Sequence, residues 1–99
     1  MHLISIQKLR KDAAHYPDVG STIEEWYATV KKARWKKLED VRAIYRDAET
    51  VGNFTVFNVK GNKYRLIVGI DYVHSVVYYK YFLTHADYDK DKWKNDPYY

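Results

Sequence analysis

Residues 54–72, which read FTVFNVKGNKYRLIVGIDY, decide the fold. β-Branched and aromatic residues dominate this stretch, and Gly61-Asn62 interrupts it. That composition is typical of strands, and a glycine–asparagine pair suits a two-residue hairpin turn. The same composition continues to Thr84 after a second break near residues 74–75. We therefore predict three antiparallel strands, at about 54–60, 63–72 and 76–84.

The sequence before these strands has the spacing of a helix. Ser21-Thr22-Ile23-Glu24 has the pattern of a capping box, which marks the start of a helix. Apolar residues then recur along one helical face. The residues of this face are Ile23, Trp26, Tyr27 and Val30, with Arg34 at the next position. We predict that Trp26 and Trp35 lie in the core.

Helices that precede a meander of strands are typical of the α+β class. We predict a short strand at residues 1–4 and then a helix from its N-cap Ser5 to about Tyr16. A short helix or turn follows at 38–45, a helical turn at 85–94, and a loose end at 95–99. The predicted fold is therefore α+β, with N-terminal helices packed on a small antiparallel sheet in a single domain over residues 1–99.

The composition limits the kinds of site and the compartment. The 99 residues include no cysteine, which excludes disulfides and thiolate metal sites. No stretch is long and apolar enough to span a membrane, and residues 1–20 lack the apolar core of a signal peptide. We therefore expect the protein to be cytoplasmic.

Positive charge is concentrated in the middle of the chain, although the net charge is only +4. Residues 31–46 carry seven Lys and Arg against two acids, and residues 51–84 carry four against Asp71 alone. This distribution favours binding to a polyanion such as RNA. A solvated helix face is the simpler explanation for residues 31–37. The residues predicted to contact RNA are Lys31, Lys32, Arg34, Lys36, Lys37 and Asn58.

The hairpin turn determines which side chains share a face of the sheet. With a two-residue turn, Lys60 lies opposite Lys63 and Asn58 lies opposite Arg65. All four then point to one face, because side chains alternate along a strand. Like charges that face each other cost stability unless an anion binds there, so a phosphate site is predicted, with a solvated face as the alternative. The other face, which would pack on the helices, contains Phe57, Val59, Tyr64 and Leu66.

The third strand adds a cation and leads to a histidine. By strand alternation, Lys80 would share a face with Tyr78, Phe82 and Thr84. His85 stands where this strand leaves the sheet, next to the predicted cationic face. Positions of this kind often carry function, although a lone histidine can also be structural.

These side chains could together cleave RNA. Attack by the 2′-hydroxyl of RNA needs a base, an acid and positive charge near the phosphate. A cluster of cations would lower the pKa of lysine and tyrosine side chains. Metal-dependent nucleases need converging carboxylates, whereas the strands offer only Asp71, so we expect neither a metal nor another cofactor. The predicted catalytic residues are Lys60, Lys63, Arg65, Lys80, His85 and Tyr88.

Two ordered blocks of sequence carry a family resemblance. They are FNVKGNKYRLIV at residues 57–68 and YKYFLTHADYD at residues 79–89, and VKKARW at residues 30–35 extends the similarity upstream. Together with Trp26-Tyr27, these blocks resemble HigB-type toxins of the RelE superfamily over nearly the whole chain. The resemblance implies a compact RelE-like fold, in which helices cover an antiparallel sheet.

The resemblance also implies a function. Such toxins are endoribonucleases that cut mRNA, usually in the A site of the 30S ribosomal subunit. The cut would proceed by 2′-hydroxyl attack without metal and leave a 2′,3′-cyclic phosphate and a 5′-hydroxyl. A HigA-like antitoxin with a helix-turn-helix domain would neutralise the toxin, and the pair would bind operator DNA through the antitoxin.

The resemblance assigns roles by position. Arg65 matches the sheet arginine that would stabilise the transition state, and His85 and Tyr88 match the Thr-His-x-x-Tyr end of the last strand. Lys80 departs from the family pattern, because arginine is common at that position. Lysine keeps the charge but lacks the bidentate guanidinium.

Two other functions fit the same residues. A non-catalytic RNA-binding module would use the basic sheet and exposed tyrosines for stacking, and it would bind RNA without cutting it. An interaction protein would instead use the basic segment 31–37 to dock an acidic partner such as an antitoxin. In that case, loss of Lys60 or Arg65 would have no effect on growth.

Overall fold

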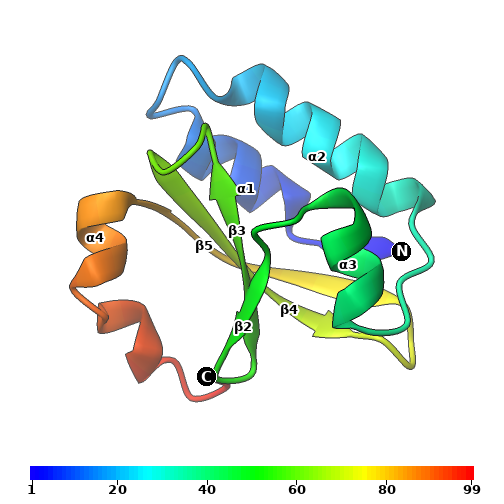
Figure 1. Ribbon diagram of the computed structural model, residues 1–99. Helices are drawn as coiled ribbons and strands as arrows, with labels where there is room; N and C mark the ends of the chain where they lie inside the picture. Colours follow the sequence, from blue (N-terminus) through cyan, green and yellow to red (C-terminus); the bar gives the residue numbers. More distant parts are fainter.

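A five-stranded β-sheet runs through the computed structural model, which describes residues 1–99 (Figure 1). Its strands lie in the order β1-β5-β4-β3-β2. β1 runs parallel to β5, and all other neighbouring strands are antiparallel. The strands are β1 (His2–Ile4), β2 (Glu49–Val51), β3 (Phe54–Val59), β4 (Tyr64–Asp71) and β5 (Val76–Thr84). The three long strands confirm the predicted meander.

The two edges of the sheet differ from the prediction. The predicted strand at residues 1–4 is confirmed as β1, but its parallel pairing with β5 makes the sheet mixed rather than antiparallel throughout. β2 is missing from the prediction because its three residues are too few to show strand alternation. It pairs with β3 through a tight turn at Gly52, whose φ is +60°.

Helices cover one face of the sheet and confirm the α+β class (Figure 1). These helices are α1 (Ile6–Ala13), α2 (Gly20–Lys32) and α3 (Leu38–Ile44). Trp26 and Trp35 are buried there as predicted, and the ring of Trp26 lies 5.6 Å from that of Phe57. No helix combines the length and apolar character needed to cross a membrane.

The predicted starts of the first two helices are only partly correct. α2 begins at Gly20, and its N-cap Val19 is buried and offers no side-chain cap. Glu24 does not complete a capping box, because its carboxylate accepts two hydrogen bonds of 2.8 Å from Arg10. Ser5 precedes α1 but makes no side-chain cap bond, and α1 ends at Ala13, before the predicted end at Tyr16. Neither helix therefore begins at a side-chain cap.

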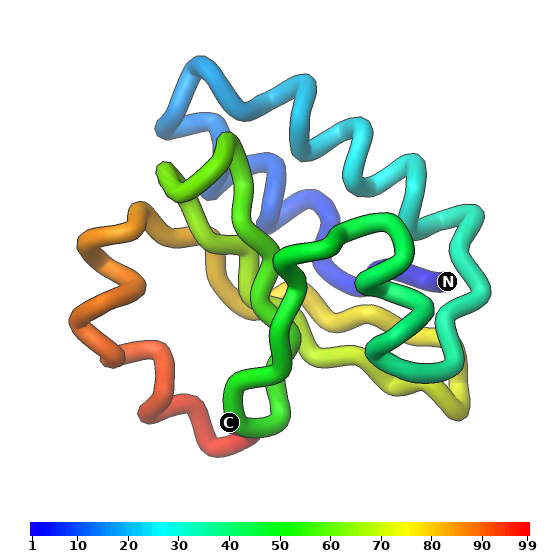
Figure 2. Tube along the Cα trace, viewed as in Figure 1, coloured from blue at the N-terminus to red at the C-terminus, as the bar shows by residue number.

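The C-terminal residues are packed, so the prediction of a loose end is wrong. After β5, helix α4 (His85–Asp89) and the 3₁₀ helix η1 (Lys92–Asn95) fold back over the second face of the sheet. The chain end lies beside the β2–β3 turn (Figure 2), where the Asn53 side-chain amide donates a hydrogen bond of 3.1 Å to the Tyr99 carbonyl. A Cβ atom on Gly52 would come within 2.6 Å of the Tyr99 ring, so this approach requires glycine.

A second hydrophobic core forms under this C-terminal segment. Phe54, Val56 and Ile67 contribute to it from the sheet, and Trp93 covers them with only 3% of its surface exposed. The Trp93 ring lies 5.4 Å from that of Tyr99. Both faces of β3 and β4 are therefore buried.

We expect Trp93→Ala to destabilise the fold by about 3 kcal/mol, because it removes the largest side chain of the second core. Urea unfolding followed by circular dichroism measures this loss. Val73→Ala is the matched control, since Val73 is 88% exposed and should lose almost nothing. A loss below about 1 kcal/mol for Trp93→Ala would show that the C-terminal segment is not part of the core.

Candidate active site

Arg65 is the most enclosed charged residue of the protein, with 9% of its surface exposed. It lies near the start of β4, opposite Asn58 on β3 and Leu83 on β5. Its neighbours Tyr64 and Leu66 point to the helix-covered face. Arg65 therefore occupies the face that the C-terminal segment covers.

Neutral oxygens hold the Arg65 guanidinium. It donates hydrogen bonds of 3.2 Å to the Asn62 carbonyl, the Asn62 side-chain oxygen and the Tyr64 carbonyl. The guanidinium carbon lies 5.4 Å from the centre of the Tyr88 ring. Seven ion pairs form in the protein, and none includes Arg65. An enclosed guanidinium without a carboxylate partner is suited to bind an external anion.

His85 is the first residue of α4, at the end of β5. Its backbone N–H donates to the Lys63 carbonyl at 3.1 Å, which ties it to the β3–β4 turn. Its Nδ1 lies 3.0 Å from a carboxylate oxygen of Asp89, one helical turn later, and the ring is about half exposed. Thr84 caps the helix by accepting a hydrogen bond from the Asp87 N–H. Asp89 therefore orients the imidazole and leaves its Nε2 available to a ligand.

Tyr88 lies between Arg65 and the second core. Its ring stacks on Trp93 at 5.1 Å with an interplanar angle of 14°, and the indole N–H donates to the Tyr88 carbonyl. Burial raises the pKa of the Tyr88 phenol, and the charge of Glu49 raises it further, whereas Arg65 opposes the rise. The phenol therefore stays protonated at neutral pH. Glu49, on the unpredicted strand β2, is the carboxylate that most affects this group.

The arrangement can perform two kinds of chemistry. Arg65 can stabilise negative charge on a phosphate, and the His85 imidazole, oriented by Asp89, can accept or donate a proton. No three His, Asp or Glu side chains converge in a way that could hold a metal ion.

Comparison with known proteins identifies the family. A model of the HigB toxins, described as the RelE-like toxic component of a toxin–antitoxin system, matches residues 20–91. The mRNA interferase toxin HigB of Escherichia coli K12 is 32% identical over 93 residues, which cover 90% of this chain and 88% of that protein. The mRNA interferase HigB of E. coli O6:H1 is 27% identical over 91% of this chain and 90% of its own length. The chain belongs to the HigB family of RelE-like toxins.

The structure places half of the catalytic residues predicted for this HigB-family member at one end of the sheet. The Arg65 guanidinium lies against the Tyr88 ring, and His85 begins the same helix, α4, where β4 begins and β5 ends. Asn58, predicted to contact RNA, lies opposite Arg65 in the predicted register. Lys60 is exposed in the neighbouring turn, with a φ of +54°. Asn62, Asp89 and Glu49 also contact or affect these residues and were not predicted from the sequence. The four-residue spacing of His85 and Asp89 indicates their pairing only once a helix is known to begin at His85.

The predicted place of Lys63 is wrong. The turn contains four residues, 60–63, closed by the Lys63 N–H donating to the Lys60 carbonyl at 3.3 Å, so the two lysines do not face each other across paired strands. The Lys63 ammonium instead lies 2.7 Å from Asp18, which also accepts a hydrogen bond from the Tyr64 hydroxyl. This contact with Asp18 raises the pKa of Lys63. The expectation that clustered cations lower the pKa of lysine and tyrosine is therefore wrong for Lys63 and Tyr88.

The predicted place of Lys80 is also wrong. A β-bulge shifts the register, so that Ile67 faces Tyr81 while Val68 faces Tyr79, and Lys80 has no partner on β4. The extra residue reverses the alternation, so Lys80 and Phe82 point to opposite faces. Phe82 belongs to the helix-covered core, and Lys80 contacts the C-terminal segment at Tyr98 and Asp96. Only Tyr78 shares the face of Lys80, as predicted.

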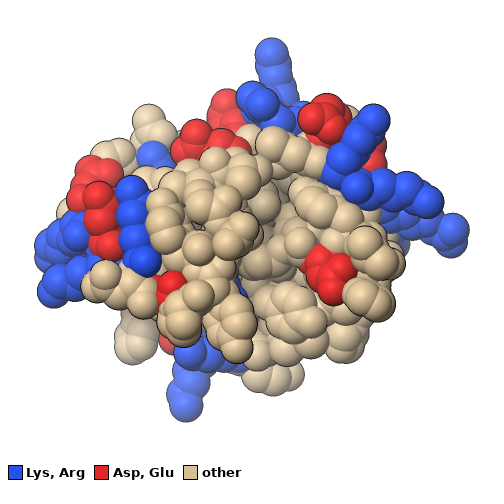
Figure 3. All heavy atoms as spheres, turned by 90° about the horizontal axis from the view of Figure 1, so that it is seen from below, with Lys and Arg blue, Asp and Glu red and all other residues tan.

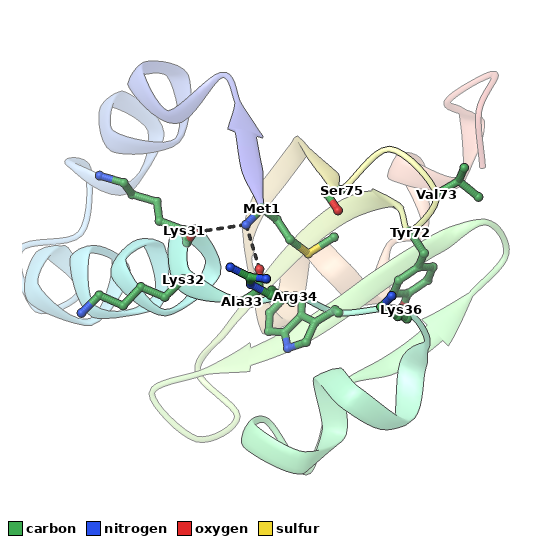
Figure 4. Close-up of a pocket in the computed structure, with 10 residues that line it drawn as sticks. Met1, Lys31, Lys32, Ala33, Arg34, Lys36, Tyr72, Val73 and Ser75 are labelled. Carbon is green, nitrogen blue, oxygen red and sulfur yellow. Dashed lines mark hydrogen bonds between the residues drawn. The ribbon is translucent and has the colours of Figure 1, made fainter.

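The basic segment 31–37 lies away from Arg65, at the end of α2. The helix stops at Lys32, and the chain then extends because Trp35 is buried in the core, so the segment is only partly helical. A pocket with a volume of about 900 Å³ lies here. Figure 4 shows this pocket and the Met1 amine, which donates hydrogen bonds to the Lys31 and Ala33 carbonyls. Of the predicted RNA contacts, Lys31, Lys32, Arg34 and Lys36 line this pocket, whereas Lys37 does not.

We expect Lys63→Gln to raise the pKa of the Asp18 carboxyl toward its ordinary range, because the Lys63 hydrogen bond is the largest of the contacts that hold that pKa down in the folded protein. A lowered folded-state pKa stabilises the fold above the usual carboxyl pKa, and the effect disappears as pH falls through the lowered value. The stability difference between wild type and variant should therefore vanish in acid.

Carboxyl NMR titration and urea unfolding at several pH values measure both effects. Lys60→Gln is the matched control, because Lys60 is the first residue of the turn that Lys63 ends, and it makes no ion pair. An unchanged Asp18 titration in Lys63→Gln would contradict the assignment.

Proposed function

We propose that this protein is an mRNA interferase, with residues 1–99 acting as one toxin domain that cuts mRNA on the translating ribosome, in the A site of the 30S subunit. One observation carries the proposal: Arg65 is enclosed without a carboxylate partner and lies against the ring of Tyr88, in the same short helix as His85, whose ring Asp89 orients. The related E. coli proteins are named mRNA interferases.

In the proposed reaction, the scissile phosphate binds to Arg65. The guanidinium presents N–H donors in a planar fork that matches two phosphate oxygens. As the 2′-oxygen attacks, negative charge grows on these oxygens, and the fixed positive charge of Arg65 stabilises it. The hydrogen bonds to Asn62 hold the guanidinium in place before the substrate arrives.

Proton transfer is assigned to His85 and Tyr88, both in α4. His85 accepts the proton of the 2′-hydroxyl at Nε2, while Asp89 stabilises the imidazolium that forms. The 2′-oxygen forms a bond to phosphorus, the bond from phosphorus to the 5′-oxygen breaks, and that oxygen takes up a proton. Tyr88 donates this proton, because its raised pKa keeps the phenol protonated at neutral pH. The products are a 2′,3′-cyclic phosphate and a 5′-hydroxyl, and no step uses a metal.

The remaining cations are assigned to binding. Lys60 and Lys63 border the site in the β3–β4 turn and attract the RNA backbone. The basic segment contacts RNA of the ribosome or message through Lys31, Lys32, Arg34, Lys36 and Lys37. As a toxin of this family, the protein has an antitoxin partner. We propose a HigA-like helix-turn-helix antitoxin, through which alone the pair binds operator DNA.

We expect Arg65→Lys to slow cleavage about 10²- to 10³-fold, because an ammonium cannot replace the bidentate guanidinium next to the phosphate. The measurement is 5′-end mapping of mRNA in a translating bacterial extract, with circular dichroism to verify folding. Arg42→Lys makes the same change at an exposed position of α3 and should cut like wild type. Wild-type cutting by a folded Arg65→Lys protein would refute the role of Arg65, and binding of RNA without cuts by the wild type would favour the RNA-binding module.

We expect a single 2′-deoxynucleotide at the mapped cut to abolish cleavage there, because the attacking oxygen is absent. The control message carries the 2′-deoxynucleotide one position downstream and should be cut normally. Mass spectrometry of the all-ribose products should find a 2′,3′-cyclic phosphate. Products with a 3′-hydroxyl and a 5′-phosphate would rule out the proposed reaction.

A further inference from the structure

A second pocket lies on the same side of the sheet as Arg65, at the opposite end of β4 and β5. Its volume is about 530 Å³, within the range of small-molecule sites. The strands supply Phe54, Gly69, Tyr78 and Lys80, and the C-terminal segment supplies Tyr98. The side of the molecule away from α1 and α2 is largely uncharged and hollowed near its middle, with Lys and Arg at its margins (Figure 3).

Lys80 is the cation of this pocket. The β-bulge directs its side chain here, where 22% of it is exposed. Its ammonium lies 4.6 Å from the centre of the Tyr98 ring, 5.5 Å from that of Phe54 and 3.9 Å from Asp96. Three groups thus fix the position of a charge that the proposed cleavage does not use.

Asp96 also holds the backbone of Tyr98, one of the aromatic residues that line the pocket. It accepts hydrogen bonds of 2.8 Å from the Tyr98 N–H and from the Tyr81 hydroxyl. Tyr98 is nevertheless 71% exposed, and Tyr78 on β5 is 40% exposed. The pocket therefore presents two accessible aromatic side chains on a backbone that is already held in place.

We propose that this pocket binds an unpaired nucleobase of the RNA substrate, at a position outside the cleaved bond. A base offers a planar ring to stack on tyrosine and hydrogen-bond acceptors for the Lys80 ammonium. Asp71 and Asn53 also line the pocket, and side-chain oxygens of these types accept hydrogen bonds from the amino groups of a base. The Asp71 carboxylate also holds His74, whose backbone N–H donates to it at 3.0 Å. A single pocket of this size suits one planar group better than a protein helix.

The distance along the sheet fits an extended RNA strand. Leu83 pairs with Arg65 and Tyr78 pairs with Gly69, so the two sites are five residues apart along β5. At about 3.3 Å per residue this is roughly 16 Å, a few nucleotides of single-stranded RNA. The inference rests on the proposed function only in naming RNA as the source of the base.

Titration of isotopically labelled protein with the four nucleoside 5′-monophosphates tests base recognition. We expect NMR shifts at Gly69 and Tyr78 with nucleotides but not with ribose 5-phosphate, which lacks the base. Tyr98→Ala should weaken nucleotide binding about 5- to 150-fold, the range for loss of one base–aromatic stack, and Tyr98→Phe should retain it. Equal shifts with ribose 5-phosphate, or unchanged binding by Tyr98→Ala, would overturn the proposal.

A second arm distinguishes RNA from free nucleotides. A short RNA, made uncleavable by a 2′-deoxynucleotide, is compared with versions that carry one abasic residue at each position. Removal of the base at one position outside the cut dinucleotide should weaken RNA binding by the wild type. The same change should not weaken RNA binding by Tyr98→Ala, because the partner of that base is already absent. A double-mutant cycle over the two changes measures this coupling. Absence of coupling at every position would restrict the pocket to free nucleotides and overturn the proposal.

The outcomes separate this inference from the proposed function. If the base and Tyr98 are coupled in binding but the protein cuts no message, the base-binding pocket is supported and the nuclease function is refuted. If the protein cuts mRNA but no coupling is found, only the base-binding pocket is refuted. Weaker antitoxin binding by Tyr98→Ala, with unchanged RNA binding, would assign the pocket to the antitoxin and overturn the proposal.

Discussion

The central strands β3 and β4 must be covered on both faces, and the rest of the structure depends on this constraint. Phe57 and Leu66 pack under the helices, whereas Phe54 and Ile67 on the opposite face need a separate cover. The C-terminal segment supplies it through Trp93. Because α4 begins the return of the chain across the sheet, it places Tyr88 against Arg65 and His85 at the end of β5. Hydrophobic burial thus assembles the candidate active site.

The same cover changes the electrostatics of the sheet. On an open face Arg65 would be a solvated cation, whereas under the Tyr88 ring it is almost enclosed. Charges interact more strongly where water is excluded. The neighbouring cations differ in whether an acid accompanies them. Asp18 pairs with Lys63, and Asp96 lies near Lys80. Arg65 has only neutral hydrogen-bond acceptors. The unpaired positive charge near the start of β4 is therefore that of Arg65, together with that of Lys60 in the adjacent turn.

Local patterns in the sequence predict much of this arrangement. Strand alternation and a tight turn depend only on residues close together in the chain. The pairing of Asn58 with Arg65 and the place of His85 at a strand end follow from these local patterns. The side chain of Lys63 does not, because it is decided by Asp18, 45 residues away in the chain. The bulge at Lys80 has no local signal either, and one inserted residue moves the side chain to the other face. Sequence patterns therefore predict which side chains lie at this end of the sheet better than they predict the partner of each cation.

An enclosed cation without a partner costs stability, so its presence in this small domain needs a reason. Elsewhere the chain supplies an acid to a largely covered cation, since Asp96 lies 3.9 Å from Lys80. A carboxylate placed permanently on Arg65 would compete with phosphate for the same donors and would cancel the charge that the transition state requires. The neutral oxygens of Asn62 orient the guanidinium without neutralising it. In the proposed nuclease, the fold gives up stability at this position so that only the substrate completes the ion pair.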